Sequence, residues 1–105
     1  MYKIGFFVPP SHVEQVKAAM FAVGAGRIGN YDSCCWQTLG EGQFRALEGS
    51  DPYLGQQGKV QKVQEFRVEL VCEDDKLRVA IAALRKAHPY EEVAFDVVQL
   101  VSFDE

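Results

Sequence analysis

The chain has 105 residues, of which 48% are hydrophobic, enough for one globular domain spanning residues 1–105 whose core needs no disulfide or metal. Its 15 acidic and 11 basic residues give a net charge of −4, and lysine and arginine do not cluster, so we do not expect nucleic acid as a partner. We find no signal-peptide pattern and no apolar stretch long enough to span a membrane, which predicts a cytoplasmic protein. Cys34, Cys35 and Cys72 lack a C-x-x-C spacing and predict reduced thiols.

The first elements of the chain show clear periodicity. Alternating apolar residues over Tyr2–Val8 predict a strand that buries one face. Two prolines end it, and the Ser11-x-x-Glu14 spacing is typical of a capping box, which predicts a helix from Ser11 to about Val23. Gly24 is suited to cap the end of this helix.

A glycine-rich segment follows. Gly24-Ala25-Gly26-Arg27-Ile28-Gly29 matches the G-x-G-x-x-G pattern, but that motif binds a dinucleotide when it follows a strand and opens a helix. Here it follows a helix, so we interpret the glycines as a cap and a turn. A second interpretation is an anion-binding concavity formed by backbone N–H groups and Arg27.

The middle of the chain alternates strands and glycines. Residues 33–39 and 43–47 flank Gly40-Glu41-Gly42, which predicts a β-hairpin with its turn at the glycines. Trp36, on the first of these strands, is expected to pack at the sheet edge or at a subunit contact. Residues 48–59 predict a polar excursion, and Val60–Cys72 is the longest strand pattern.

The C-terminal third predicts a helix and a strand around a fixed turn. Asp74 and Asp75 are expected to cap a helix that carries apolar residues at helical spacing and stops at His88-Pro89. Residues 93–103 then predict a closing strand that is apolar on both faces.

This order of elements predicts an α+β fold. It is the split β-α-β arrangement of a ferredoxin-like sandwich, with both helices on one face of an antiparallel sheet and an extra β-hairpin. The other sheet face then carries Phe7, Val71, Val98 and Leu100, an apolar patch that is uncommon on a monomer. We therefore expect a homo-oligomer, either a dimer or a trimer.

The stretch His88-Pro89-Tyr90-Glu91-Glu92 places an imidazole beside two carboxylates. In one interpretation it is a helix stop, in which His88 complements the helix dipole and the glutamates are solvated. In the other it is a corner that binds a ligand or metal ion.

Several separated motifs give the chain a resemblance to a known family. They are Phe7-Val8-Pro9, residues 24–34, residues 40–45, residues 55–59 and residues 87–92. Their order over nearly the whole chain resembles the YqfO type of the Nif-three-like family, and specifically the domain inserted in the middle of its longer members, here standing alone. The resemblance implies a fold similar to the PII signalling and CutA proteins, which are oligomers. The longer members carry a dinuclear metal site on flanking domains whose motifs this chain lacks, so a metal-dependent hydrolase function is not expected.

Three kinds of function remain open from the sequence. The first is a non-enzymatic binding or regulatory module for a small molecule or protein, in which the loops 31–35, 51–59 and 88–92 meet at a cleft between subunits. The second is a divalent copper or zinc site that uses His88 with Glu91 or Glu92 and one cysteine, since adjacent strand cysteines point to opposite faces. The third is an enzyme with a Cys–His or His–carboxylate pair, which no triad, phosphate-loop or cofactor motif accompanies. The candidate ligand-binding residues are Arg27, Tyr31, Cys34, His88, Tyr90, Glu91 and Glu92, and those for a metal are His88 and Glu91.

Overall fold

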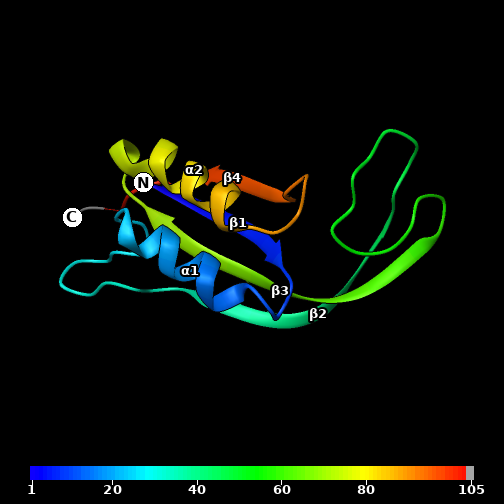
Figure 1. Ribbon diagram of the computed structural model, residues 1–105. Helices are drawn as coiled ribbons and strands as arrows, with labels where there is room; N and C mark the ends of the chain where they lie inside the picture. The colour runs from blue at the N-terminus through cyan, green and yellow to red at the C-terminus, as the bar shows by residue number, and fades with distance from the viewer. Residues whose placement is uncertain (104–105) are drawn as a thin grey trace.

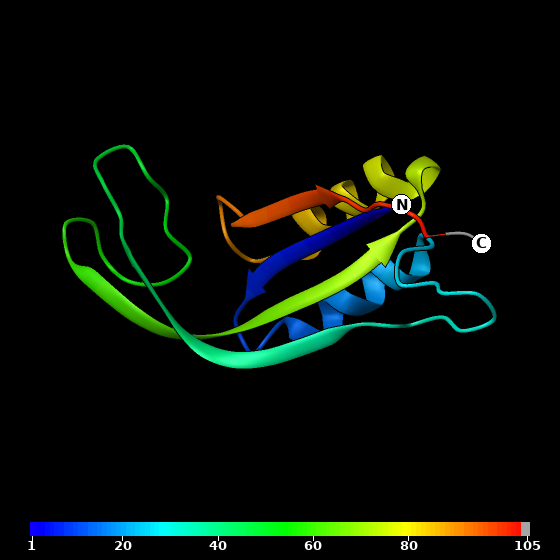
Figure 2. The same cartoon turned by 180° about the vertical axis from the view of Figure 1, so that it is seen from behind.

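A computed structural model describes residues 1–103 of the protein as one four-stranded antiparallel sheet with two helices on one of its faces (Figures 1 and 2). The strands are β1 (Tyr2–Val8), β2 (Trp36–Arg45), β3 (Val60–Cys72) and β4 (Phe95–Gln99), in the spatial order β2-β3-β1-β4. The helices are α1 (Val13–Ala22) and α2 (Leu77–Ala87), preceded by the 3-10 turn η1 (Asp74–Lys76). This confirms the predicted ferredoxin-like α+β sandwich. Neither helix is long and apolar enough to cross a membrane, as far as residues 1–103 show.

The core lies between the sheet and the two helices. Alternate residues of β1 and β3 point into it because successive strand side chains face opposite sides, and both helices bury one stripe against them. The buried residues of this core are Ile4, Phe6, Val8, Val13, Val16, Met20, Ala25, Val68, Leu70, Cys72, Ala80 and Leu84. The predicted limits of the first and longest strands and the burial of their faces are confirmed.

The helix termini correct two predictions. Helix α1 begins at Val13 with His12 as N-cap and no side-chain cap, because the Ser11 hydroxyl is hydrogen-bonded to His12 Nδ1 at 2.8 Å instead of to the helix backbone. Asp74 likewise does not cap α2; its carboxylate pairs with the N-terminal amine of Met1. At the other end of α1, Gly24 has φ of +104°, and its N–H and that of the next residue reach back to Phe21 O and Met20 O, which is the predicted glycine cap.

The predicted β-hairpin with its turn at Gly40–Gly42 is wrong. Residues Trp36–Arg45 form one continuous strand, because both glycines are extended and pair with β3, Gly40 opposite Glu65 and Gly42 opposite Val63. The connection that reverses the chain is the 46–59 loop. A long β2–β3 hairpin results, and its outer part, which we call the arm, comprises residues 40–45 and 60–65 with the 46–59 loop. β1 pairs with β3 only from Phe66 onward, so the arm projects beyond the rest of the sheet (Figure 1).

The closing strand is shorter than predicted. It ends at Gln99, which lies opposite Tyr2 at the start of β1, and one further hydrogen bond joins Leu100 N to Met1 O. Val101 and Phe103, which were predicted to continue the strand, lie exposed outside the sheet. The apolar pattern of residues 93–103 therefore overestimates the length of the strand.

Candidate ligand-binding site

The turn after α2 is fixed by His88. This residue takes an extended conformation at the end of the helix, as Pro89 requires, and only 6% of its surface is exposed. Its Nδ1 accepts a hydrogen bond from Tyr90 N at 3.1 Å, and its Nε2 lies 2.7 Å from Phe7 O. A nitrogen that accepts an N–H carries no proton, so the network assigns His88 as a neutral imidazole whose Nε2–H donates to Phe7 O.

The electrostatics agree with this assignment. Burial lowers the pKa of His88 from its ordinary value, more than the hydrogen bond to Phe7 O raises it, and His12 lowers it further. The imidazole therefore ties the 88–94 turn to β1 as a neutral group. The predicted metal pair of His88 and Glu91 would require one of these two internal bonds to break before His88 could bind a cation.

The 46–59 loop is held closed and then attached to this turn. Gly58 N donates to Ala46 O at 2.7 Å across the base of the loop, and the Ser50 hydroxyl donates to Leu47 O at 2.6 Å. Asp51 N donates to the Glu91 carboxylate at 2.9 Å, which joins two segments forty residues apart in sequence. Glu91 therefore connects the arm to the end of α2.

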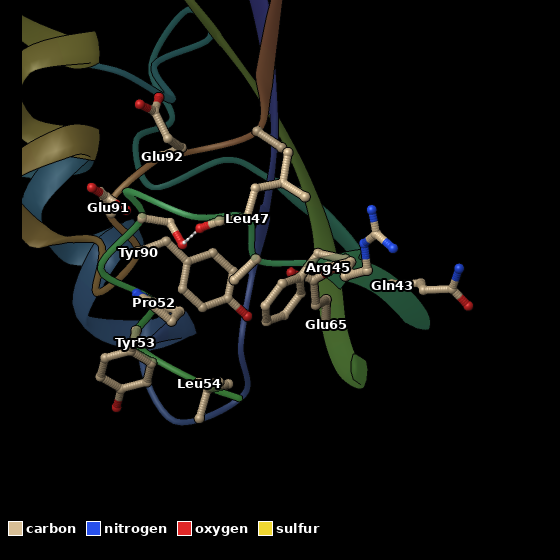
Figure 3. A pocket seen from close by; sticks show the side chains of 14 residues that line it. Gln43, Arg45, Leu47, Pro52, Tyr53, Leu54, Glu65, Tyr90, Glu91 and Glu92 are labelled. Atoms are coloured by element: carbon tan, nitrogen blue, oxygen red, sulfur yellow. Dashed lines mark hydrogen bonds between the residues drawn. The ribbon is translucent and has the colours of Figure 1, made fainter. Parts of the chain in front are cut away.

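A cavity of about 430 Å³ lies at this junction (Figure 3). Its volume is in the range of natural small-molecule sites, and its lining is mostly apolar and aromatic with a few polar groups. The lining residues are Gln43, Phe44, Arg45, Ala46, Leu47, Ser50, Pro52, Tyr53, Leu54, Glu65, Tyr90, Glu91, Glu92 and Ala94.

Tyr90 is central in this cavity. Its ring centroid lies 4.8 Å from that of His88, 6.1 Å from Tyr53 and 6.5 Å from Phe44, so three elements contribute to one aromatic cluster. The Tyr90 hydroxyl oxygen is buried, and no hydrogen bond of normal length and angle reaches it among the described residues, although the Glu65 carboxylate interacts with it. Burial raises the pKa of Tyr90 to about 12, and the charge of the Glu65 carboxylate, its weak hydrogen bonding to the hydroxyl and the charge of Tyr53 act in the same direction. A buried hydroxyl without a partner costs free energy, which a bound polar group would recover.

The structure separates the predicted site residues into two groups. Tyr90, Glu91 and Glu92 line the cavity, and His88 lies directly behind Tyr90. The remaining three, Arg27, Tyr31 and Cys34, lie in the 24–35 loop at the opposite end of the sheet, near the N-terminus (Figure 1). Within one chain, the predicted loops 51–59 and 88–92 meet at the cavity, whereas α1 and β2 carry the 24–35 loop away from the arm. The expected cleft between subunits stays a prediction.

Phe44, Arg45 and Glu65 line the cavity but were not predicted to lie at the site, whereas Tyr53 belongs to the loop 51–59 that was expected there. Residues 43–47 were assigned to a hairpin in the sheet rather than to an arm. Tyr53 carried the one usable signal, since it follows Asp51-Pro52 in an excursion of the kind that often carries function.

The two adjacent cysteines lie outside strand β2, which begins at Trp36. Both Cys34 and Cys35 therefore line one shallow cavity of about 240 Å³ beside Lys3, instead of pointing to opposite faces as a strand would require. Cys34 lies in the loop at the opposite end of the sheet from the arm, so one chain does not bring it to the cavity beside His88. In the part of the chain that the structure describes, no group of three or more histidine, cysteine, aspartate or glutamate side chains is placed to hold a metal ion.

The sequence matches longer bacterial proteins over nearly its whole length, although no family model matches it. It is 47% identical over 95 residues to the GTP cyclohydrolase 1 type 2 homolog of Mycobacterium tuberculosis, covering 90% of this chain and 25% of that protein. The protein of the same name from Halalkalibacterium halodurans is 39% identical over 102 residues, covering 97% and 27%. A Bacillus cereus protein related to NIF3 superposes with a TM-score of 0.83 at 40% identity, over 96% of this chain and 26% of that one.

This chain is homologous to one segment of the Nif-three-like family. It spans about a quarter of the length of the curated relatives it matches. The segment also shares its fold with CutA proteins. The Archaeoglobus fulgidus periplasmic divalent cation tolerance protein CutA gives a TM-score of 0.70 at 13% identity, over 100% of this chain and 89% of that one. The PII-like protein CutA from Nostoc gives 0.67 at 15% identity, over 95% and 81%. Identities this low establish the fold alone, and they confirm the predicted PII/CutA-like architecture.

Proposed function

We propose that this Nif-three-like segment is a homo-oligomeric binding module that takes a small organic ligand in the cavity between the arm and the 88–94 turn. The observation that supports this most directly is the buried Tyr90 hydroxyl without a hydrogen-bond partner in a cavity of about 430 Å³. Such a group is stabilised when a ligand supplies the missing hydrogen bond.

The geometry favours binding over catalysis. His88 is the imidazole of this site, and both of its nitrogens are used to hold the turn together. A general base needs a nitrogen that can reach the proton it removes, and here the ring is buried behind Tyr90. The Glu91 carboxylate is likewise engaged by Asp51 N. Glu91 therefore forms part of the cavity wall, and His88 supports that wall from behind Tyr90.

The same bonds weigh against the alternative of a divalent metal at His88 and Glu91. The "divalent cation tolerance" in the name of one CutA neighbour belongs to a protein that shares the fold at 13% identity. The cyclohydrolase name belongs to proteins of which this chain spans about a quarter. No feature of the cavity described above supports either of these two activities for this chain.

A second copy of the chain is the partner that the sheet favours. The helix-free face exposes Phe7, Trp36 and Val98, which are 39%, 60% and 50% accessible. In the arm, residues 60–65 of β3 pair only with β2, and an isolated two-stranded ribbon has marginal stability in water. Contact with a neighbouring copy would cover the apolar face and support the arm.

Light scattering coupled to size exclusion tests the assembly. We expect a mass of two or three chains for wild type, and a lower mass for Val98→Asp, which places a charge on the helix-free face. Val79→Asp is the matched control, because Val79 is 46% accessible on α2 and lies on the helix side. A monomeric wild type, or equal effects of the two substitutions, would contradict this part of the proposal.

Ligand-observed NMR with a fragment library of mixed charge tests the cavity. We expect bound fragments to be lost in Ala94→Phe, which fills the cavity from an exposed position, and retained in Ala82→Phe, an exposed residue of α2 outside it. If no fragment of any charge binds wild type, or if Ala94→Phe changes nothing, the cavity is not a binding site.

A further inference from the structure

The charge of the cavity lining is predominantly negative. Glu65, Glu91 and Glu92 contribute three carboxylates, while Arg45 is the one positively charged lining residue among those that the structure describes. In Figure 3 the Arg45 guanidinium points away from the Tyr90 ring at the centre of the site. A bound anion would meet uncompensated carboxylates, which disfavours it.

Aromatic rings form much of the remaining wall. The ring centroid of Tyr90 lies 6.1 Å from that of Tyr53 and 6.5 Å from that of Phe44. The faces of such rings carry partial negative charge, and they attract ammonium groups while also accepting apolar surface. The walls thus suit a ligand that is both apolar and cationic.

The Glu65 side chain reaches the cavity through space that Gly42 leaves open because it has no side chain. Its side chain lies against Gly42 on the neighbouring strand β2, where a methyl group would collide with the carboxylate. It also faces Tyr90 closely enough to raise the pKa of that hydroxyl. The Glu65 carboxylate of β3 and the Tyr90 hydroxyl of the 88–94 turn therefore lie close together at the cavity.

We propose that the cavity selects organic cations, namely ligands with an apolar body and a protonated primary or secondary amine whose N–H groups bond to the Glu65 carboxylate and the Tyr90 hydroxyl. This inference rests on the proposed binding function and specifies its ligand class. The apolar body lies against Tyr53, Phe44 and Leu54, and the amine lies toward β3.

Three probes with the same phenylethyl body test the charge preference: 2-phenylethylammonium, 2-phenylethanol and 3-phenylpropanoate. Titration of wild type at pH 7, followed by NMR chemical shifts, is expected to show the ammonium probe binding at least about tenfold more tightly than the other two, the scale of one charge-assisted hydrogen bond.

Glu65→Gln is the deciding variant, since it keeps shape and removes charge. We expect it to weaken the ammonium probe by about tenfold and to leave 2-phenylethanol unchanged. Glu41→Gln is the control: Glu41 is an exposed carboxylate of β2 that does not line this cavity, and its substitution should change neither probe.

The outcomes separate this inference from the function on which it rests. Suppose that fragments bind wild type and that Ala94→Phe blocks them. If the ammonium probe is then not preferred, or if Glu65→Gln does not weaken its binding, the cation preference is overturned and the binding site is retained. Absence of binding by every fragment and probe would overturn both.

Discussion

Replacement of His88 by alanine tests how the turn and the cavity are built. The helix-stop interpretation of the sequence predicts a loss of only about 0.3 to 1 kcal/mol, the value of an imidazole at an exposed helix end. The structure predicts more, because the ring is buried and satisfies Phe7 O and Tyr90 N at once. One carbonyl and one N–H left without partners predict a loss of about 2 to 4 kcal/mol.

Urea unfolding followed by circular dichroism measures this difference, at one protein concentration for all variants because association contributes to apparent stability. His12→Ala is the matched control. It removes the other histidine of the chain, whose ring is bonded to the Ser11 hydroxyl at the surface and lies 5.8 Å from the Tyr53 ring. We expect it to cost less than about 1 kcal/mol.

The pH dependence gives an independent check. Burial lowers the pKa of folded His88 below its ordinary value of 6.5, so the unfolded chain binds the proton first as the pH falls. The stability that His88 contributes is therefore complete above pH 6.5 and is lost as the pH falls from 6.5 through the folded pKa. The difference between wild type and His88→Ala should shrink over this window. A loss no larger than that of His12→Ala, or one that grows toward acid, would refute the neutral buried imidazole.

Two further predictions concern the open sheet face and Tyr90. Arg67 crosses β1 above Gly5 to reach Asp96 on β4, with Nη1–Oδ1 and Nη2–Oδ2 distances of 2.7 and 3.2 Å, and a methyl group at position 5 would collide with the guanidinium. Gly5→Ala should therefore lower the free energy of unfolding in urea by about 1 kcal/mol or more. The control is Gly40→Ala, at a strand glycine with open space around it, which should be neutral or slightly stabilising. Equal effects of the two substitutions would contradict the passage of Arg67 over Gly5. The difference between the absorbance titrations of wild type and Tyr90→Phe at 295 nm should give a midpoint of about 12 for Tyr90. The free energy of unfolding should fall as the pH rises from 10 toward 12, because Tyr90 ionises first in the unfolded chain. A midpoint near 10 would show that the hydroxyl is not buried.

The elements with strong local patterns were predictable from the sequence. Strands β1 and β3 and the end of α2 at Pro89 were placed correctly, because alternation, helical spacing and the proline ring act over a few residues. The glycine pair at Gly40 and Gly42 misled the prediction for the same reason. Local pattern cannot distinguish a glycine that turns the chain from one that makes room for Glu65 on the adjacent strand.

The candidate site depended on contacts between residues far apart in sequence. The segment 88–92 stood out in the sequence, and three of its residues line the cavity, but Phe44, Tyr53 and Glu65 reach it only because the arm folds over the 88–94 turn. Arg27, Tyr31 and Cys34 were grouped with it on residue type, and the fold carries them to the other end of the sheet.

The sequence by itself thus determined the class of fold, the buried faces of β1 and β3 and the position of the turn at Pro89, since each follows from backbone geometry and side-chain periodicity within one segment. Only the tertiary structure decided that β2 runs unbroken through its glycines, that β4 pairs with β1 only as far as Gln99, and that His88 is a neutral structural group rather than a free ligand. These outcomes depend on which partner each hydrogen-bonding group finds across the sheet, and that choice is made when distant segments pack together.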